Sequence, residues 1–281
     1  MESGKESMAS RERPIYIVGN WKMYHTIQTS LEFLNELIPK VREAVCRIYL
    51  AVPFTSIGPM AKDIEENDSN IVIGAQNMHN ASEGAFTGEI AAKMLVEAGA
   101  EFVILGHSER RRLFHEDNAF INAKVKRALT DGLQPILCIG ETSQEREDGM
   151  TNEVLKRQLT ECLDDIPAEQ LENVLLSYEP IWAIGTDKPA TPEIAQESHH
   201  FCREFLAELG GKEVADKMSI LYGGSVKVDN AKALLDQPDI DGLLIGGASL
   251  SAVTFNEIIS KAAAESGLED VKADSDTAVE L

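Results

Sequence analysis

The chain has 281 residues, 43% of them hydrophobic, which fits one large α/β domain or two small ones with a real core. Its formal net charge of −21 argues against a protein that binds nucleic acid or an anionic membrane, because both would repel it. Local backbone donors and a few cations would therefore have to attract any anionic substrate.

The cysteines and the chain ends are typical of a cytoplasmic protein. The first 13 residues are polar, and no apolar run approaches the ~20 residues needed to span a bilayer. We expect free thiols in a reducing cytosol, because the cysteines form no CxxC pair and no metal-ligand spacing. The cysteines are Cys46, Cys138, Cys162 and Cys202.

Eight short apolar runs recur along the chain, and each has the length of a β-strand. Their starts fall 23 to 46 residues apart, the size of a strand–helix unit. Most lack apolar–polar alternation, as expected for parallel strands covered on both faces. The expected strands are 15–19, 48–52, 71–76, 102–105, 134–139, 173–178, 219–222 and 242–245.

The stretches between these runs show helical spacing. We expect Thr29 and Ser30 to cap a helix that stops before Pro39. Residues 119–129 and 191–209 are also amphipathic, and we expect a helix over each range.

The alternation of strands and helices predicts a single (β/α)8 barrel over residues 14–264, the catalytic domain. A doubly wound open sheet is the alternative. A Gly-x-Gly-x-x-Gly turn after the first strand would favour that sheet, but residues 19–22 form no such turn. We expect a polar N-terminal extension over 1–13 and a disordered acidic tail over 265–281.

The sixth expected strand ends on a lone carboxylate, Glu179, and Pro180, bulky apolar residues and Gly185 follow at once. A carboxylate there can act as a base, and the apolar segment can close over it. Exclusion of water raises the basicity of a carboxylate and protects a reactive intermediate. The alternative is an ordinary solvated glutamate before a loop.

Other distinctive residues follow other strands at the same rim, where a (β/α)8 barrel carries its chemistry. Asn20 and Lys22 follow the first strand, and His107 follows the fourth. The set fits proton transfer next to a carbonyl: Glu179 would remove a carbon-bound proton, His107 would polarise the carbonyl oxygen, and Lys22 would stabilise an enediolate. Each residue alone also has a structural explanation, and Glu109 can simply pair with a nearby base.

Two glycine pairs follow the seventh and eighth strands: Gly223-Gly224, with Ser225 after it, and Gly246-Gly247. Glycine lets a backbone N–H approach an anion, and loops after these two strands are the usual phosphate site of this fold. Two such pairs favour phosphate binding over the alternative that glycines simply end the strands. The histidines have no metal-ligand spacing, so we expect no metal.

In this order, these residues closely resemble the triosephosphate isomerase family over nearly the whole of residues 15–260. The resemblance rests on many separate motifs rather than on one. The motifs are Gly19-Asn20-Trp21-Lys22-Met23, Gly74-Ala75-Gln76-Asn77, Gly84-Ala85-Phe86-Thr87-Gly88-Glu89, Gly106-His107-Ser108-Glu109-Arg110, Cys138-Ile139-Gly140-Glu141, Tyr178-Glu179-Pro180-Ile181-Trp182-Ala183-Ile184-Gly185-Thr186, Tyr222-Gly223-Gly224-Ser225 and Gly246-Gly247-Ala248-Ser249-Leu250.

The resemblance implies an isomerase of glycolysis and gluconeogenesis, with no metal or organic cofactor. It would interconvert dihydroxyacetone phosphate and D-glyceraldehyde 3-phosphate through an enediol(ate). By this resemblance Glu179 is the base and His107 is a neutral imidazole that acts as the electrophile. Asn20 and Lys22 would hold substrate and stabilise negative charge, and Glu109 would support the site.

The resemblance also implies a phosphate grip and a lid. Residues 180–190 would close over the phosphate and prevent its elimination from the enediolate. At the lid's far end Asp187 and Pro189 depart from the family's pattern, and the proline predicts a stiffer hinge. Tyr24, near the expected subunit interface, stands where the family more often has Asn. The expected phosphate-binding backbone donors are those of Gly185, Ser225, Gly246 and Gly247.

A homodimer is implied as well. The loop of residues 79–89, from His79 to Glu89, would insert into the partner next to Met23. Thr87 would then brace Asn20 and Lys22 of the other subunit.

Two other functions remain open. Another phosphate-binding barrel enzyme, such as an aldolase or epimerase, would be favoured by a Schiff-base lysine inside a strand or by a metal cluster. A catalytically inactive homologue that acts as a binding protein would lack Glu179, His107 or Lys22, and all three are present.

Overall fold

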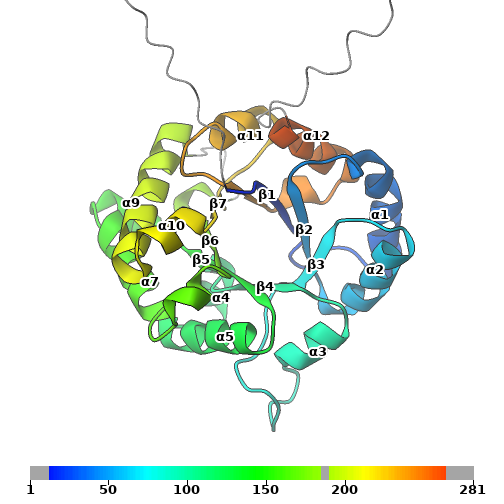
Figure 1. Cartoon of the computed structure of the whole chain (residues 1–281), viewed down its shortest axis with the longest axis horizontal. Helices are drawn as coiled ribbons and strands as arrows, with labels where there is room; N and C mark the ends of the chain where they lie inside the picture. Colours follow the sequence, from blue (N-terminus) through cyan, green and yellow to red (C-terminus); the bar gives the residue numbers. More distant parts are fainter. Residues whose placement is uncertain (1–12, 185–189, 264–281) are drawn as a thin grey trace, which may run out of the picture.

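Eight parallel strands form a closed barrel, and helices surround it (Figure 1). The computed structural model describes residues 13–184 and 190–263. The (β/α)8 prediction is confirmed, and an open sheet is excluded because β1 pairs with β8 as well as with β2. The strands lie within one or two residues of their expected limits. They are β1 (Tyr16–Asn20), β2 (Arg47–Val52), β3 (Val72–Ala75), β4 (Phe102–Leu105), β5 (Gln134–Ile139), β6 (Leu175–Tyr178), β7 (Ile220–Tyr222) and β8 (Gly242–Ile245).

Helices and short 3₁₀ turns connect the strands, and the helices cover the outside of the barrel (Figure 1). No helix among the described residues is long and apolar enough to cross a membrane. The helices are α1 (Ile27–Val41), α2 (Phe54–Glu66), α3 (Ala92–Glu97), α4 (Ser108–Leu113), α5 (Asn118–Thr130), α6 (Ser143–Glu147), α7 (Thr151–Cys162), α8 (Ala168–Leu171), α9 (Pro192–Gly210), α10 (Lys212–Lys217), α11 (Val228–Leu235) and α12 (Ala252–Ala263), with the 3₁₀ turns η1 (Ile181–Ala183) and η2 (Gly247–Ser249).

Helix α1 differs from its prediction at both ends. It begins after Thr26, whose hydroxyl accepts from the Thr29 N–H while Thr29 Oγ1 accepts from the Thr26 N–H, so this pair forms a capping box. The helix also continues through Pro39 to Val41. Pro39 lies on the exposed face, so water can solvate the carbonyl that loses its partner there, and the buried side chain of Val41 holds the last turn on the core. The helices expected over 119–129 and 191–209 are confirmed as α5 and α9.

The buried residues form two shells that share the same strands. In β1, Tyr16 and Val18 point into the barrel, while Ile17 points outward toward the helices. Both shells are apolar, which explains why the strands lack apolar–polar alternation. Gly74 makes room inside the barrel, since a Cβ there would lie 2.3 Å from the ring of Phe102.

A buried ion-pair network joins α9 to the amino ends of β7 and β8. Arg203 lies 2.6 Å from a carboxylate oxygen of Asp239 and 2.6 Å from one of Asp241. Asp241 also accepts from the Ile220 N–H at 3.0 Å and from Arg13 Nε at 2.8 Å. Arg13 therefore packs on the barrel, although the sequence places it in the N-terminal extension. The limits of that extension and of the acidic tail stay predictions, because residues 1–12 and 264–281 lie outside the described part of the chain.

All four cysteines are free, as their spacing predicts, and all are buried. Burial raises the pKa of each thiol, to about 11 for Cys46 and well above the ordinary value for Cys138. At neutral pH these side chains are therefore protonated, and they pack as small apolar groups.

His199 of α9 is fully buried between two tyrosines. Its ring lies 5.6 Å from that of Tyr178 and 6.2 Å from that of Tyr222, measured between centroids. Nδ1 donates to the carbonyl of Ala195 at 2.7 Å. Burial lowers the pKa of His199 to about 4, and although Asp241 opposes this, Arg203 adds to it.

We expect His199 to make the fold sensitive to acid. The unfolded chain takes up a proton at this residue near pH 6.5, whereas the folded chain does so only at about 4. The contribution of His199 to the free energy of unfolding is therefore full above pH 6.5. It falls as the pH is lowered toward 4, by roughly 1 kcal/mol per pH unit. Urea unfolding of wild type and His199→Gln at one protein concentration tests this. The variant should lose less stability across that pH range, and parallel pH profiles would contradict the assignment.

Candidate active site

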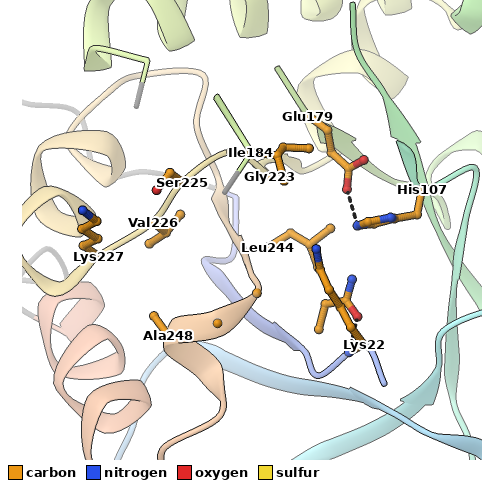
Figure 2. A pocket seen from close by; sticks show the side chains of 14 residues that line it. Lys22, His107, Glu179, Ile184, Gly223, Ser225, Val226, Lys227, Leu244 and Ala248 are labelled. Carbon is orange, nitrogen blue, oxygen red and sulfur yellow. Dashed lines mark hydrogen bonds and ion pairs between the residues drawn. The ribbon is translucent and has the colours of Figure 1, made fainter. Parts of the chain in front are cut away.

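A cavity of about 380 Å³ lies at the carboxyl ends of the strands. Side chains from β1, β4 and β6 approach it on one side, and the turns after β7 and β8 lie on the other (Figure 2). The cavity brings together seven of the eight residues expected to be catalytic or to bind phosphate: Asn20, Lys22, His107, Glu179, Ser225, Gly246 and Gly247. Gly185 lies outside the described residues, as do Asp187 and Pro189 at the expected hinge.

Glu179 is 2% exposed, so the alternative of an ordinary solvated glutamate is wrong. The main chain of Glu179 extends the pairing of β6 with β5, because its N–H donates to the carbonyl of Ile139 at 2.7 Å. Its Oε2 accepts from the backbone N–H of Ser108 at 3.0 Å. Neighbouring backbone, rather than water, therefore holds this carboxylate in place.

His107 lies beside Glu179 on the same side of the cavity (Figure 2), with Nε2 3.3 Å from Glu179 Oε1. The other ring nitrogen, Nδ1, accepts from the backbone N–H of Glu109 at 3.2 Å. A nitrogen that accepts this bond carries no proton, so the neutral ring carries its proton on Nε2. The residue also caps α4, and this geometry directs an N–H donor into the cavity.

Lys22 is held in a backbone conformation that non-glycine residues seldom adopt, with φ of 52°. Its N–H donates to Asn20 Oδ1 at 3.1 Å. Trp21, between them, is fully buried, and its Nε1 donates to the carbonyl of Ser249 at 3.1 Å. The buried tryptophan anchors the turn, and the strained residue after it directs its side chain toward the cavity (Figure 2).

Glu109 contacts the lysine from the edge of the site. Its Oε1 lies 2.6 Å from Lys22 Nζ, and its Oε2 lies 3.8 Å from His107 Nδ1. Burial alone would raise the pKa of the Glu109 carboxyl, but the hydrogen bond from Lys22 and the positive charges of Lys22 and Arg112 help to lower it. Glu109 therefore stays ionised and fixes the position of the Lys22 ammonium.

The glycine turn after β8 leaves open space for an anion. A Cβ on Gly247 would meet nothing within 4 Å, and one on Gly246 would meet only the Lys22 side chain, at 3.6 Å. The N–H of Ser225, however, donates to the carbonyl of Ala183 at 3.1 Å. In this structure the turn after β7 is therefore bonded to η1, the start of the expected lid, and this donor is not free for a phosphate.

Glu141 is a buried carboxylate at the end of β5 to which the sequence analysis assigns no role. Its Oε1 accepts from Tyr178 Oη at 3.0 Å and from Trp182 Nε1 at 2.9 Å, and Arg146 lies 3.1 Å away. Glu141, which follows β5, thus links that strand to Trp182 in the segment after Glu179. The only indication in the sequence is that Glu141 ends the motif after the fifth strand.

Lys227 is a second cation at the cavity that the sequence analysis omits. It lies beside Ser225 on the side opposite His107 and Glu179 (Figure 2). Its place just after the Gly223-Gly224-Ser225 turn could have indicated it. Thr87, by contrast, lies in an exposed loop and does not line this cavity. Among the described residues, no three His, Cys, Asp or Glu side chains are grouped to hold a metal ion.

A family model described as triosephosphate isomerase matches residues 15–262. The chain belongs to the triosephosphate isomerase family. It is 54% identical to the triosephosphate isomerase of Protochlamydia amoebophila over 90% of this chain and 95% of that protein. It is 50% identical to the enzyme of Carboxydothermus hydrogenoformans and 51% identical to that of Fusobacterium nucleatum, in each case over 88% of this chain and 98% of the relative. The family and these names indicate an isomerase enzyme.

Triosephosphate isomerase activity should be sensitive to any side chain at Gly223. A Cβ there would lie 2.7 Å from Glu179 Cγ and 2.7 Å from Ser177 Oγ. Because the buried carboxylate would have to move, we expect Gly223→Ala to lower kcat for dihydroxyacetone phosphate by about 100-fold. The control is Gly58→Ala on α2, where the nearest atom to a Cβ is the Ala98 carbonyl oxygen at 3.9 Å. Equal kcat values for the two variants would contradict the prediction.

Proposed function

We propose that this protein interconverts dihydroxyacetone phosphate and D-glyceraldehyde 3-phosphate, with Glu179 as the base and His107 as the proton donor to oxygen. The observation that carries the proposal is the pairing of a buried carboxylate with an imidazole N–H at 3.3 Å, beside an open glycine turn. Family membership supports the same reaction.

The geometry supports a two-stage proton transfer. Glu179 removes a proton from the carbon next to the carbonyl, and the electron pair moves onto the carbonyl oxygen to give an enediolate. His107 donates its Nε2 proton to that oxygen and recovers a proton from the neighbouring hydroxyl. Glu179 then returns its proton to the other carbon. Lys22 and Asn20 stabilise the negative charge on the oxygens during these steps.

The phosphate would bind at the turns after β7 and β8, through the backbone N–H groups of Gly246, Gly247 and Ser225, and through Gly185 of the lid. The Ser225 N–H would have to leave the Ala183 carbonyl, so phosphate binding and movement of η1 would occur together. An aldolase mechanism is less compatible with the site, because Lys22 follows β1 and its ammonium is ion-paired with Glu109 rather than held free inside a strand. A cytoplasmic location fits this reaction.

The assignment of the base can be tested with a coupled assay on dihydroxyacetone phosphate. Glu179→Asp shortens the side chain by one methylene, which moves the carboxylate by roughly 1 Å and should lower kcat by about 100-fold or more. KM should change much less, because the phosphate turns are untouched. An inactive wild type would overturn the proposed function, and a variant as fast as wild type would remove Glu179 as the base.

The proposed active assembly is a homodimer. Residues 79–89 belong to a loop that projects beyond the ring of helices (Figure 1), and the backbone bridge from His79 to Ala91 closes its base. Within the loop the ring of Phe86 lies 4.2 Å from that of His79. A second cavity, of about 750 Å³, lies beside the active site. Its lining includes the exposed apolar side chains of Met23, Tyr24, Leu113 and Phe114.

These two features complement each other. Met23 is 94% exposed and lies next to other exposed apolar residues. Such a group of exposed apolar side chains is unusual on a protein surface that has no partner. Insertion of a partner's loop would cover it and would bring Thr87 of the partner subunit toward Asn20 and Lys22. Residues of both subunits would then contact the strained turn at Lys22 and hold it in place.

Met23→Arg tests the dimer with little risk to the single subunit, because the side chain is almost wholly exposed. We expect sedimentation to show a monomer and kcat to fall by at least about 10-fold, since Lys22 loses its support. Val253→Arg on α12, also an exposed apolar position, should leave both the assembly and kcat unchanged. A monomeric Met23→Arg protein with undiminished kcat would refute the link between assembly and activity.

A further inference from the structure

A buried side-chain amide on α7 contacts the site's framework, although the proposed mechanism does not use it. Gln158 is 8% exposed and makes two hydrogen bonds to one residue, Gly140, just after β5. Its Oε1 accepts from the Gly140 N–H at 2.8 Å, and its Nε2 donates to the Gly140 carbonyl at 3.1 Å. The amide therefore replaces a strand partner and fixes the peptide groups on both sides of Gly140.

Gly140 in turn touches the main chain of Glu179. A Cβ at Gly140 would lie 1.8 Å from the Glu179 carbonyl oxygen, so the two backbones are in contact. On one side of this contact the Glu179 N–H donates to Ile139 at 2.7 Å, and on the other the Ile181 N–H donates to Glu141 at 3.1 Å. Residues 139–141 thus determine where the backbone of Glu179 lies and where η1 begins.

We propose that Gln158 is a positioning residue for the base: it holds Gly140, and Gly140 holds the backbone of Glu179. The inference rests on the proposed function, in which Glu179 removes the proton. Ser108 fixes only the carboxylate end of the side chain, so the backbone needs its own support. Proton transfer requires this support, because a displacement of about 1 Å can cost about 100-fold in rate.

Loss of the amide should therefore lower turnover more than substrate affinity. In Gln158→Met, which keeps the side chain's length, we expect kcat to fall about 10- to 100-fold. KM for dihydroxyacetone phosphate should change less than about threefold, since the phosphate turns follow β7 and β8 and do not contact Gln158. If Gln158→Met does not fold, Gln158→Glu serves, because it keeps the acceptor for the Gly140 N–H and removes the donor to its carbonyl.

A control on the same helix separates positioning from general destabilisation. Leu159, the next residue, is fully buried in the outer core and has no polar group to bond Gly140. Leu159→Ala destabilises the fold by a cavity, yet kcat should stay within about twofold of wild type. An equal fall in kcat in both variants, or an unchanged kcat in Gln158→Met, would overturn the proposal.

A double-mutant cycle tests whether Gln158 acts through the base. If it does, the fold loss in kcat of the double variant, Gln158→Met with Glu179→Asp, should be smaller than the product of the fold losses of the two single variants. Losses that multiply would overturn the positioning role while leaving the proposed function intact. The proposed function itself fails by a different result, an inactive wild type or a Glu179→Asp variant as fast as wild type.

Discussion

The arrangement of the site depends on two hydrogen bonds made by the start of α4. Its first two backbone N–H groups diverge: that of Ser108 donates to the carboxylate of Glu179, and that of Glu109 donates to Nδ1 of His107. One short helix therefore holds both groups and also decides which nitrogen of the imidazole carries the proton. Because the donors are backbone atoms anchored to β4, their positions do not depend on a side-chain rotamer.

An acidic chain must still hold an anionic substrate, and the site is arranged for this locally. The chain has a net charge of −21, yet two cations, Lys22 and Lys227, line the cavity. Glu109 does not cancel this effect, since it orients the Lys22 ammonium rather than entering the cavity. Backbone N–H groups in the glycine turns add positive potential with no net charge. Charges and dipoles at the site act on a bound anion at short range, whereas salt screens charges that lie farther away.

The sequence predicts the barrel well, because each strand is a short apolar run and the runs recur at the spacing of strand–helix units. Glu179, His107 and Lys22 could be selected because each follows such a run, and parallel strands bring their carboxyl ends to one rim. Local patterns do not predict contacts that the fold itself creates. The burial of Glu179, the bond from Ser225 to Ala183 and the pairing of Gln158 with Gly140 all join separate elements. Such contacts depend on the closure of the whole barrel.

The start of α1 differs from the prediction for a local reason. Thr26 and Thr29 are both good capping residues, and the reciprocal bonds between them decide which one begins the helix. Pro39 is tolerated because the carbonyl it leaves unpaired is on the solvent face. A pattern of residue types cannot distinguish these cases without knowing which face of the helix is buried.

The buried thiols can report how often each part of the native protein opens. A thiolate, not a thiol, attacks alkylating and oxidising reagents, and burial both raises the pKa of these cysteines and blocks access to them. Cys138 lies at the end of β5 and Cys202 in the middle of α9, so a reagent reaches them only when different parts of the barrel open. The rate at which each sulfur is labelled in the native protein therefore measures how often its own region opens, with no introduced cysteine.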